Sequence, residues 1–511
     1  MTMPTRRRIF ESAVSTWLNP GGGVESLCGN YRLRHGVIRP QAVADVQNIL
    51  RAASRAAGAV RLQTWSCGKN WGFGSDLATG NDVYTLDLSL LKSIRSLNLP
   101  GHCVELEPGV TQGQLDDALS EQGSTHYFNV TGAGLGASII GNALERGIGY
   151  SGQRHLDLLD LEVVLPDGQL TRTSRFASTS STGGYLGGLG PDPTGLFCQS
   201  SFGVVTAATI ALYRRPEVMG GVLCRLCDPS LFPKMISAVS DLIAEGVSYG
   251  VPHIFNRERI VTTFSPHVSP AQTADVRATA APWTALIPIR GSRQVFAALA
   301  QEIEDRLKSF GRVELLSDKP GTGPKLSSLI EGRPSDLALA SVAYSVFGPS
   351  APPINTPIDA SGAGLIHITP AMPLCGTTIA EIEQLTHETL SRHGYEAVPI
   401  SLNALSARTA AMVVSLGFDR RFREMTLAAH RAADDLLEAY LGAGLVPYRL
   451  GLRQAGQLPP MDGPWPKLFR EMQRLFDPGE CLAPSRYEPL WNHDAPPQGT
   501  KEPEETQLCM S

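Results

Sequence analysis

Two glycine-rich loops limit what this chain can fold into more than any other feature of its sequence. The first spans residues 66–75, reads SCGKNWGFGS, and directly follows a short strand pattern at 60–63. The second spans residues 131–138, reads TGAGLGAS, and precedes Gly141. Backbone N–H groups that converge from two such loops form a concavity for an anion, and glycine lets a pyrophosphate approach the backbone closely. The loops therefore predict a site for a dinucleotide.

Two other interpretations of these loops compete with that one. Residues 132–137 satisfy the GxGxxA string of a Rossmann fingerprint, but no clean βαβ unit surrounds them. Short glycine strings also occur in ordinary tight turns, and either loop taken alone fits that description. The choice depends on what accompanies the loops along the chain.

The composition indicates a protein that acts on small molecules. Among the 511 residues, 44 Lys and Arg stand against 49 Asp and Glu, and the net charge of -5 provides no basic field for nucleic acid. No apolar run approaches the roughly 20 residues of a membrane helix. The basic N-terminal residues are not followed by an apolar signal segment, so we expect no membrane partner and a cytoplasmic location. The nine scattered cysteines predict free thiols.

Several residues of chemical interest have a plainer structural interpretation. Cys224 and Cys227 have the CxxC spacing of zinc ligands and redox dithiols, but no second CxxC or histidine pair completes a four-ligand site. The residues around them have the composition of a strand, so we predict no metal site. Asp157 and Asp160 are predicted to be solvated or capping residues.

Regular structure can be placed around the two loops. Apolar residues in 43–50 have helical spacing, and strand patterns occur at 83–88 and 103–110. The Asp-Gly dipeptide at 167–168 supplies the positive φ angles of a hairpin turn. Residues 178–190, rich in Ser, Thr and Gly, predict a surface loop.

The chain changes character at about residue 216. From there to about 446 it alternates strand-like and helical segments without glycine-rich loops, which predicts an inserted second domain. Residues 296–310 and 379–393 predict helices, and residues 364–369 predict a strand that alternates across two faces. Beyond Pro489 the sequence turns to Pro, Glu, Lys and Gln, which predicts a disordered tail.

Five segments in a fixed order make the glycine-rich loops more specific. They are the SCGKNWGFG of 66–74, the EPGVTQG of 107–113, the GNALERGIGY of 141–150, the PTGLFCQSSFGVVT of 193–206 and the DPGECLAP of 477–484. In order and spacing these segments resemble the vanillyl-alcohol oxidase and p-cresol methylhydroxylase family of FAD-linked oxidoreductases. The resemblance is good over about 35–215, weak through the inserted segment, and fair from about 440 to 488.

This resemblance implies an α+β fold in which a two-subdomain FAD-binding fold of the vanillyl-alcohol oxidase type carries an inserted α+β cap domain. The expected limits are 1–215 for the FAD-binding domain, 216–446 for the cap or substrate domain, 447–488 for the C-terminal return and 489–511 for the tail. The residues implied to contact FAD are Ser66, Cys67, Gly68, Lys69, Asn70, Trp71, Gly72, Phe73, Gly74, Pro108, Gly109, Gly132, Gly136, Ser138, Gly141, Asn142, Arg146, Gly147, Tyr150, Gly203, Val204 and Val205.

The resemblance also implies catalytic residues. The family holds a phenolate with a Tyr-Arg pair, and Tyr448 and Arg449 resemble that pair. The choice of residues is chemically reasonable, because both side chains can donate hydrogen bonds to an oxyanion. The alternative is a surface Tyr-Arg dipeptide on a strand. His367 is the candidate base, because its strand corresponds to the one over the substrate in the relatives and imidazole titrates near neutrality. Its alternative is a partly buried structural histidine.

Three departures from the family pattern bear on the chemistry. Phe73 stands where a third phenolate-binding tyrosine is expected, and Ala133 or a neighbour stands where the family has an aspartate base. Residues 405–419 contain neither the histidine nor the tyrosine that carries a covalent flavin. We therefore expect FAD to be bound noncovalently.

The function predicted on these grounds is that of an FAD-dependent oxidase or dehydrogenase. It transfers a hydride from a small, aromatic or natural-product substrate to flavin N5, as a tailoring step in secondary metabolism. One alternative is a 4-alkylphenol or aryl-alcohol oxidase, and an alternative of another class is a catalytically idle FAD-fold binding protein. The electron acceptor is O2 or an unidentified partner, and the relatives imply a homodimer.

Overall fold

The structure is a computed structural model. It describes residues 2–69, 71–74, 76–81, 83–174, 190–316, 326–354, 356–458, 463–484 and 486–488. Asn70, nearly all of the predicted surface loop at 178–190, and the predicted tail at 489–511 lie outside the described residues.

The N-terminal part of the chain forms a four-stranded sheet with the order β1-β2-β4-β3. Its strands are β1 (Leu18–Glu25), β2 (Tyr31–Ile38), β3 (Leu62–Trp65) and β4 (Val83–Asp87). Helices α1 (Met3–Ala13) and α2 (Val43–Arg55) pack on it. The helix predicted from the spacing of apolar residues is confirmed as α2, which buries Val46, Ile49, Leu50 and Ala53. Strand β4 runs parallel to both β2 and β3.

A second, five-stranded antiparallel sheet follows, with the order β5-β6-β10-β8-β9. Its strands are β5 (Ile94–Asn98), β6 (Cys103–Leu106), β8 (Leu158–Val164), β9 (Leu170–Arg172) and β10 (Val204–Ala211). Helices α3 (Gln112–Glu121) and α4 (Ile139–Leu144) share its core, and β7 (His126–Tyr127) pairs with β11 (Tyr213–Arg214). The predicted hairpin is confirmed, because Gly168 has φ +81° in the turn between β8 and β9. Strand β6 ends at Leu106, earlier than predicted, since Pro108 has no N–H to pair.

The third sheet has eight strands in the order β15-β12-β14-β13-β17-β18-β16-β19, and every neighbouring pair is antiparallel. Its strands are β12 (Val218–Leu226), β13 (His253–Asn256), β14 (Trp283–Gly291), β15 (Gly311–Leu315), β16 (Ala363–Pro373), β17 (Ile400–Ala404), β18 (Thr409–Asp419) and β19 (Val446–Arg449). The predicted strand at 364–369 is confirmed within β16.

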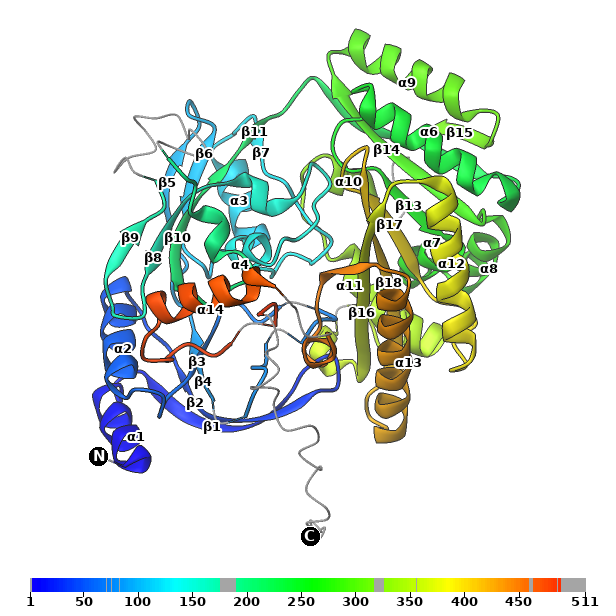
Figure 1. Cartoon of the computed structure of the whole chain (residues 1–511). Coiled ribbons are helices and arrows are strands. Elements are labelled where there is room, and N and C mark those ends of the chain that lie inside the picture. Colours follow the sequence, from blue (N-terminus) through cyan, green and yellow to red (C-terminus); the bar gives the residue numbers. More distant parts are fainter. Residues whose placement is uncertain are drawn as a thin grey trace.

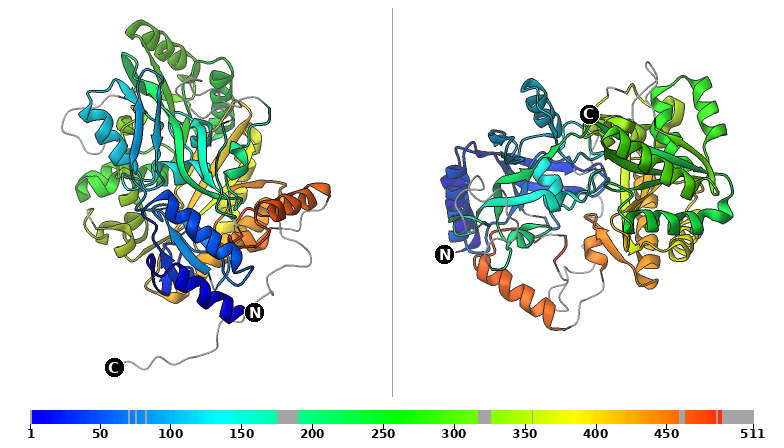
Figure 2. Two further views of the ribbon diagram at one scale, coloured as in Figure 1. Left: turned by 90° about the vertical axis from the view of Figure 1, so that its left-hand side faces the viewer. Right: turned by 90° about the horizontal axis from the view of Figure 1, so that it is seen from above.

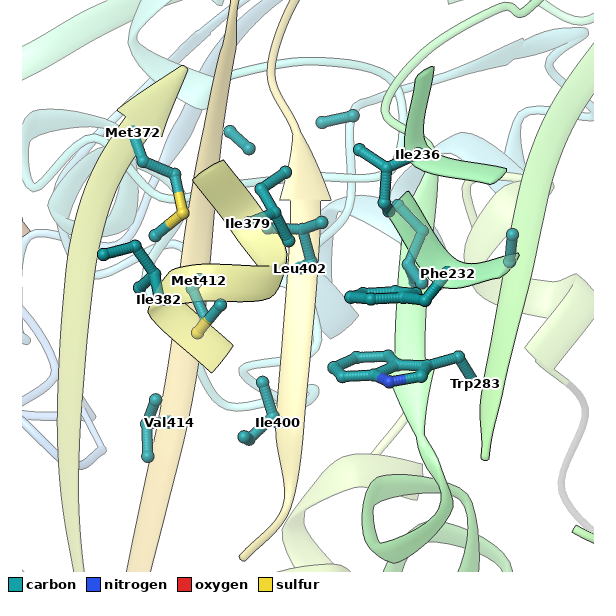
Figure 3. Close-up of a cluster of buried hydrophobic side chains, with 14 of the residues drawn as sticks. Phe232, Ile236, Trp283, Met372, Ile379, Ile382, Ile400, Leu402, Met412 and Val414 are labelled. Atoms are coloured by element: carbon teal, nitrogen blue, oxygen red, sulfur yellow. The ribbon is translucent and has the colours of Figure 1, made fainter. Parts of the chain in front are cut away.

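Four helices cover the outer side of this sheet, away from the N-terminal half (Figure 1). They are α6 (Phe232–Ala244), α9 (Arg293–Leu307), α12 (Gly376–Ser391) and α13 (Arg423–Gly442). The helices predicted at 296–310 and 379–393 are thus confirmed as α9 and α12, each beginning three residues earlier. Figure 3 shows Phe232 of α6 stacked on Trp283 of β14, with ring centroids 4.4 Å apart. Buried apolar contacts of this kind fix the helices to the sheet.

Shorter helices complete the cap. They are α7 (Arg257–Phe264), α8 (Pro270–Thr279), α10 (Leu326–Ile330) and α11 (Leu337–Phe347). Helix α11 contacts β16 and β18. Helices α7 and α11 contribute side chains to a cavity between the eight-stranded sheet and the glycine-rich loops.

After β19 the chain returns to the N-terminal half. Helix α14 (Pro464–Phe476) lies beside the five-stranded sheet rather than with the green part of the cap (Figure 2). Leu482 then bridges in parallel to Leu62 of β3. The predicted limit between 446 and 447 falls inside β19, which pairs with β16. We therefore propose that the cap runs to Arg449 and that the return begins after it.

Candidate functional site

Two cavities lie along the predicted cofactor segments. The first, which we call the loop cavity, has a volume of about 220 Å³ and lies between the first glycine-rich loop, α4 and the C-terminal return. Predicted cofactor residues in its wall are Ser66, Gly68, Lys69, Pro108, Ser138, Gly141, Asn142, Gly203 and Val205. Segments that are far apart in the sequence therefore meet around one space.

The second, the cap cavity, has a volume of about 290 Å³ and lies between the loops and the cap. Predicted site residues in its wall are Lys69, Trp71, Phe73, Gly132, Asn142, Gly147, Tyr150, His367, Tyr448 and Arg449. Lys69 and Asn142 belong to both walls, so the two cavities adjoin at these residues. The predicted residues that line neither cavity are Cys67, Gly72, Gly74, Gly109, Gly136, Arg146 and Val204.

Some of these last residues hold the walls in place. Gly72 has φ +80°, and a Cβ on it would lie 2.3 Å from Cδ2 of His367, so a side chain does not fit between loop and cap. The Gly72 carbonyl accepts a hydrogen bond from the His367 backbone N–H at 2.9 Å. Val204 is fully buried in the core under the N-terminal sheet. The family motif thus marks supporting residues as well as residues that face a cavity.

Ser138 connects the second loop to the rest of the site. Its hydroxyl donates to the Pro108 carbonyl at 2.6 Å and accepts from the Gly141 N–H at 2.9 Å, which caps α4. A Cβ on Gly141 would lie 2.3 Å from the Ser66 hydroxyl oxygen, so glycine lets the two loops touch. The predicted convergence of the loops has this local cause.

Tyr448 and Arg449 are not a surface dipeptide, because both line the cap cavity from β19. The Tyr448 hydroxyl donates to the Arg146 carbonyl at 2.7 Å and to Gln153 Oε1 at 3.2 Å. Burial raises the pKa of Tyr448 to about 12, so the phenol is neutral near pH 7. The Arg449 guanidinium lies 4.1 Å from the centroid of the Phe73 ring.

A partly buried carboxylate that sequence reasoning missed, Glu145, accompanies Arg449. Glu145 Oε2 accepts from Arg449 at 3.4 Å, from Arg486 at 2.7 Å and from the Tyr487 hydroxyl at 2.8 Å. Burial alone raises the pKa of Glu145, but Arg486, Arg449 and Tyr487 outweigh it and lower that pKa below its ordinary value. Glu145 lies inside the GNALERGIGY segment, but its partners from the C-terminal return gave no signal in the sequence.

His367 lies between the loop and the cap sheet. Its Nδ1 is 3.0 Å from the Ser415 hydroxyl, and its ring centroid is 5.4 Å from that of Phe73. Burial, together with the charges of Arg259 and Arg449, lowers the pKa of His367 to about 3. The imidazole is therefore neutral near pH 7.

Arg259 of α7 is a second residue that sequence reasoning missed. Asn256 caps α7 by accepting from the Arg259 N–H, which directs this helix toward the cavity. Nη2 of Arg259 donates to the Ser415 hydroxyl at 2.5 Å and to the Pro399 carbonyl at 3.2 Å. Arg259 lies in the part of the chain where the family resemblance is weak, so no motif marked it.

The structure bears on the departures noted in the sequence. Ala133 lines the cap cavity, and its carbonyl accepts from the Trp71 indole N–H at 3.1 Å. No Asp or Glu among the described residues lines the cap cavity, and the expected carboxylate base is not replaced from another element of that part of the chain. On the β18 side, the cavity is lined by Val413 and Ser415, neither of which is a carboxylate.

The residues given a plainer interpretation are structural in different ways. Cys224 is buried in β12, Cys227 is exposed, and every cysteine of the described segments is a free thiol. The prediction that Asp157 and Asp160 are solvated or capping residues is wrong, because both are buried. Asp157 accepts from Asn129 at 2.9 Å, and Asp160 accepts from Arg172 at 2.7 Å. Their partners from distant segments compensate the burial.

Comparison with known proteins supports an FAD-binding domain. Residues 35–174 match the model of an FAD-binding domain, and this range contains both glycine-rich loops. The chain is 29% identical to 1'-carboxy-chondrochloren decarboxylase of Chondromyces crocatus, over 90% of this chain and 91% of that protein. It is 22% identical to the flavoprotein subunit of 4-cresol dehydrogenase (hydroxylating) of Pseudomonas putida, over 87% of this chain and 86% of that subunit.

The fold agrees with these relatives. Crystalline p-cresol methylhydroxylase with substrate bound superposes with a TM-score of 0.80 at 19% identity, over 94% of this chain and 96% of that one. The chain is thus similar over most of its length to proteins of the vanillyl-alcohol oxidase and p-cresol methylhydroxylase family, as its motifs predicted. It is an FAD-dependent oxidoreductase, and its expected two-subdomain α+β fold with a cap is confirmed. Of the helices in the described ranges, not one is both long and apolar enough to span a bilayer.

The residues of this flavoprotein fit FAD. The Asn142 side chain lines both cavities, and its Oδ1 is buried without a hydrogen-bond partner among the described residues. Such an atom is costly unless a ligand donates to it. Lys69 and Arg486 also place cationic groups, which suit a pyrophosphate, in the wall of the loop cavity, where Arg486 pairs with Glu145 and Lys69 with Asp359.

Proposed function

We propose that this flavoprotein oxidises a small aromatic or natural-product molecule in the cap cavity by removing a hydride from a carbon atom. The observation that carries the proposal is the position of the cap cavity, which adjoins the loop cavity at Lys69 and Asn142. FAD, when bound, supplies the hydride acceptor at N5. The loop-cavity residues named above would hold it, and the cap residues would bind and orient the substrate.

The lining of the cap cavity supports an aromatic substrate. Trp71, Phe73, Phe255 and Phe264 contribute rings, and Leu365 adds an apolar side chain. Aromatic side chains of this kind bind flat apolar ligands, while a few polar groups fix their orientation. His367 is proposed as one of these polar groups. A neutral imidazole can accept a proton during the reaction, so its role as base stays a prediction.

Two narrower chemistries are candidates. Similarity to the 4-cresol dehydrogenase subunit favours oxidation of an alkylphenol or aryl alcohol, with Tyr448 and Arg449 at the phenol oxygen. Against it, Phe73 removes one donor and the Tyr448 hydroxyl already donates to Arg146 and Gln153. Similarity to a decarboxylase over 90% of the chain favours loss of carbon dioxide coupled to the oxidation.

We further propose that FAD is bound noncovalently, that O2 or a second acceptor reoxidises it, and that the chain acts as a cytoplasmic homodimer. The absence of His and Tyr from 405–419 supports the first of these statements. Reoxidation rates in air, with and without artificial acceptors, test the second. Sedimentation of the purified protein tests the third.

The experiment that tests the function is anaerobic reduction of the bound flavin. Vanillyl alcohol, 4-cresol, 4-ethylphenol and 3-(4-hydroxyphenyl)propionate are mixed with the holoprotein, and the flavin absorbance is followed. We expect at least one donor to bleach the flavin with a rate that saturates. A flavin that dithionite reduces but none of these donors reduces contradicts the proposal and favours the idle binding protein.

A further inference from the structure

The cap cavity has an unbalanced charge. Three cations line it, Lys69, Arg259 and Arg449, and no carboxylate of the described residues lines it. Lys69 pairs with Asp359 at 3.0 Å and Arg449 pairs with Glu145 at 3.4 Å. Arg259 differs from the other two, because no Asp or Glu in the described segments pairs with it.

Arg259 also keeps donors that no described residue uses. Its Nη2 is bound by Ser415 and Pro399, whereas its buried Nε has no partner and its Nη1 donates to none of the residues described. Burial lowers the pKa of Arg259 to about 10, so the guanidinium stays charged near pH 7. A charge held away from water without a counterion is costly unless a ligand compensates it.

Tyr150 faces the same cavity from the other half of the molecule. Its ring stacks on His253 of β13, with centroids 4.4 Å apart and an angle of 13° between planes. The Tyr150 hydroxyl forms no hydrogen bond to any described residue, and burial raises its pKa, so it remains a donor. Tyr150 and Arg259 both line the cap cavity. Together they offer a guanidinium and a phenol to one ligand group.

We propose that Arg259, assisted by Tyr150, binds a carboxylate of the substrate, so that this enzyme acts on aromatic carboxylic acids. A carboxylate is already charged near pH 7, and its two oxygens match the planar fork of a guanidinium. A phenol, in contrast, loses its proton only near pH 10. The inference rests on the proposed function, because it names the substrate class of the same cavity.

The pair predicted from the sequence is less available for such an anion. The Tyr448 hydroxyl donates to Arg146 and Gln153, and the charge of Arg449 is offset by Glu145. Arg259 has no comparable compensation within the described part of the cavity. The carboxylate is therefore assigned to the α7 side of the cavity rather than to β19.

The test is a binding titration of the oxidised holoenzyme. Binding is monitored through the change that the ligand causes in the flavin absorption spectrum. The probes are 3-(4-hydroxyphenyl)propionate and its primary amide, which differ in charge but hardly in size. Charge-assisted hydrogen bonds of this kind correspond to about 10-fold or more in affinity. We expect the wild type to bind the acid at least about 10-fold more tightly than the amide.

Variants locate the effect. Arg259→Gln should abolish the preference for the acid while FAD content and amide binding stay unchanged, and Arg259→Lys should keep part of the preference. Arg257→Gln is the matched control, because Arg257 lies on the same helix but is exposed, and it should behave as the wild type. Tyr150→Phe should weaken binding of the acid more than binding of the amide.

Three outcomes overturn the inference. They are equal affinity of the wild type for acid and amide, an undiminished preference in Arg259→Gln, and no spectral response to either probe. The titration needs no turnover, so these results are distinguishable from failure of the proposed function. That failure appears as a bound flavin that no donor reduces.

Discussion

Glu145 joins three segments of the chain around one carboxylate, and its charge is the reason that Arg449 and Arg486 can lie in the interior. About 25% of the Glu145 side chain remains accessible, because it lines the loop cavity. The ion pairs of Glu145 with Arg449 and Arg486 are therefore only partly enclosed. Removing the carboxylate leaves two cations without their counterion, which is the costly way to break such a cluster.

We predict that Glu145→Gln lowers the free energy of unfolding by about 2 kcal/mol, less than the 3–5 kcal/mol of a fully enclosed pair. Urea unfolding near pH 7 measures this change. The folded-state pKa of Glu145 is lowered, so its contribution is present above the unfolded pKa and is lost as pH falls through the folded pKa. The difference between wild type and variant should therefore shrink in acid. Glu302→Gln, which breaks an exposed pair with Arg306, should cost less than about 0.5 kcal/mol.

At Gly72 the first glycine-rich loop lies directly against His367 of the cap. In Gly72→Ala the new Cβ meets His367 and the left-handed φ of +80° is retained, so strain and clash add. We predict a loss of about 2 kcal/mol in the free energy of unfolding and weaker FAD binding. Gly123→Ala has a similar φ of +58° but open space, and it separates strain from clash. Equal losses in the two variants would contradict the role given to Gly72.

At the residue scale, predicted cofactor residues that belong to single motifs lie along one cavity. Ser66, Gly68 and Asn142 line the loop cavity as the motif spacing suggested. Prediction from sequence did not work where the partner comes from a distant segment. Arg259 reaches the site because α7 is packed under the cap sheet, and Arg486 reaches Glu145 across the return of the chain. Neither contact has a local pattern.

At the scale of elements, α14 fastens the C-terminal return to the FAD-binding half. Phe476 stacks on Phe202 with centroids 4.9 Å apart and meets Phe197 edge-on at 6.2 Å. Residues that follow this helix line the loop cavity, namely Leu482, Ala483, Pro484, Arg486 and Tyr487. Packing of this helix is therefore coupled to the cofactor site.

We predict that Phe476→Ala lowers the free energy of unfolding by about 2 kcal/mol, because the ring is half-buried rather than fully buried. It should also raise the dissociation constant of FAD, measured by flavin fluorescence. Leu475→Ala is the matched control, since Leu475 is 80% exposed on the same helix and should change neither quantity. Unchanged FAD affinity in Phe476→Ala would show that the packing of α14 does not affect FAD binding.

Helix α13 holds a histidine that makes stability depend on pH. Burial, together with the charge of Arg453, lowers the pKa of His430 to about 4, whereas an unfolded histidine titrates near 6.5. As pH falls from 6.5 to 4, the unfolded chain takes up this proton and the native protein does not, so stability falls. We predict that, in His430→Leu, the free energy of unfolding falls by about 3 kcal/mol less between pH 6.5 and pH 4 than it does in the wild type. Urea unfolding across this pH range measures it, and parallel pH profiles of the two proteins would contradict the prediction.

Across the whole molecule, the sequence predicted the fold mainly through the order of five motifs. The change of composition at about residue 216 indicated an inserted domain, and the family resemblance supplied its role as a cap and the later return of the chain. The order of the eight cap strands could not be predicted, because pairs such as β13 with β17 join residues about 150 positions apart. Local patterns still identified α2, α9, α12 and the hairpin of β8 and β9, where the burial follows the sequence period.

The central claim is that this chain holds FAD noncovalently where the loops meet the cap. The measurement that tests it most directly is the absorption spectrum of the purified protein before and after acid precipitation. We predict a flavin spectrum whose chromophore passes into the supernatant and is identified there as FAD. Flavin retained in the pellet contradicts noncovalent binding, and a colourless protein that takes up no added FAD contradicts the account as a whole.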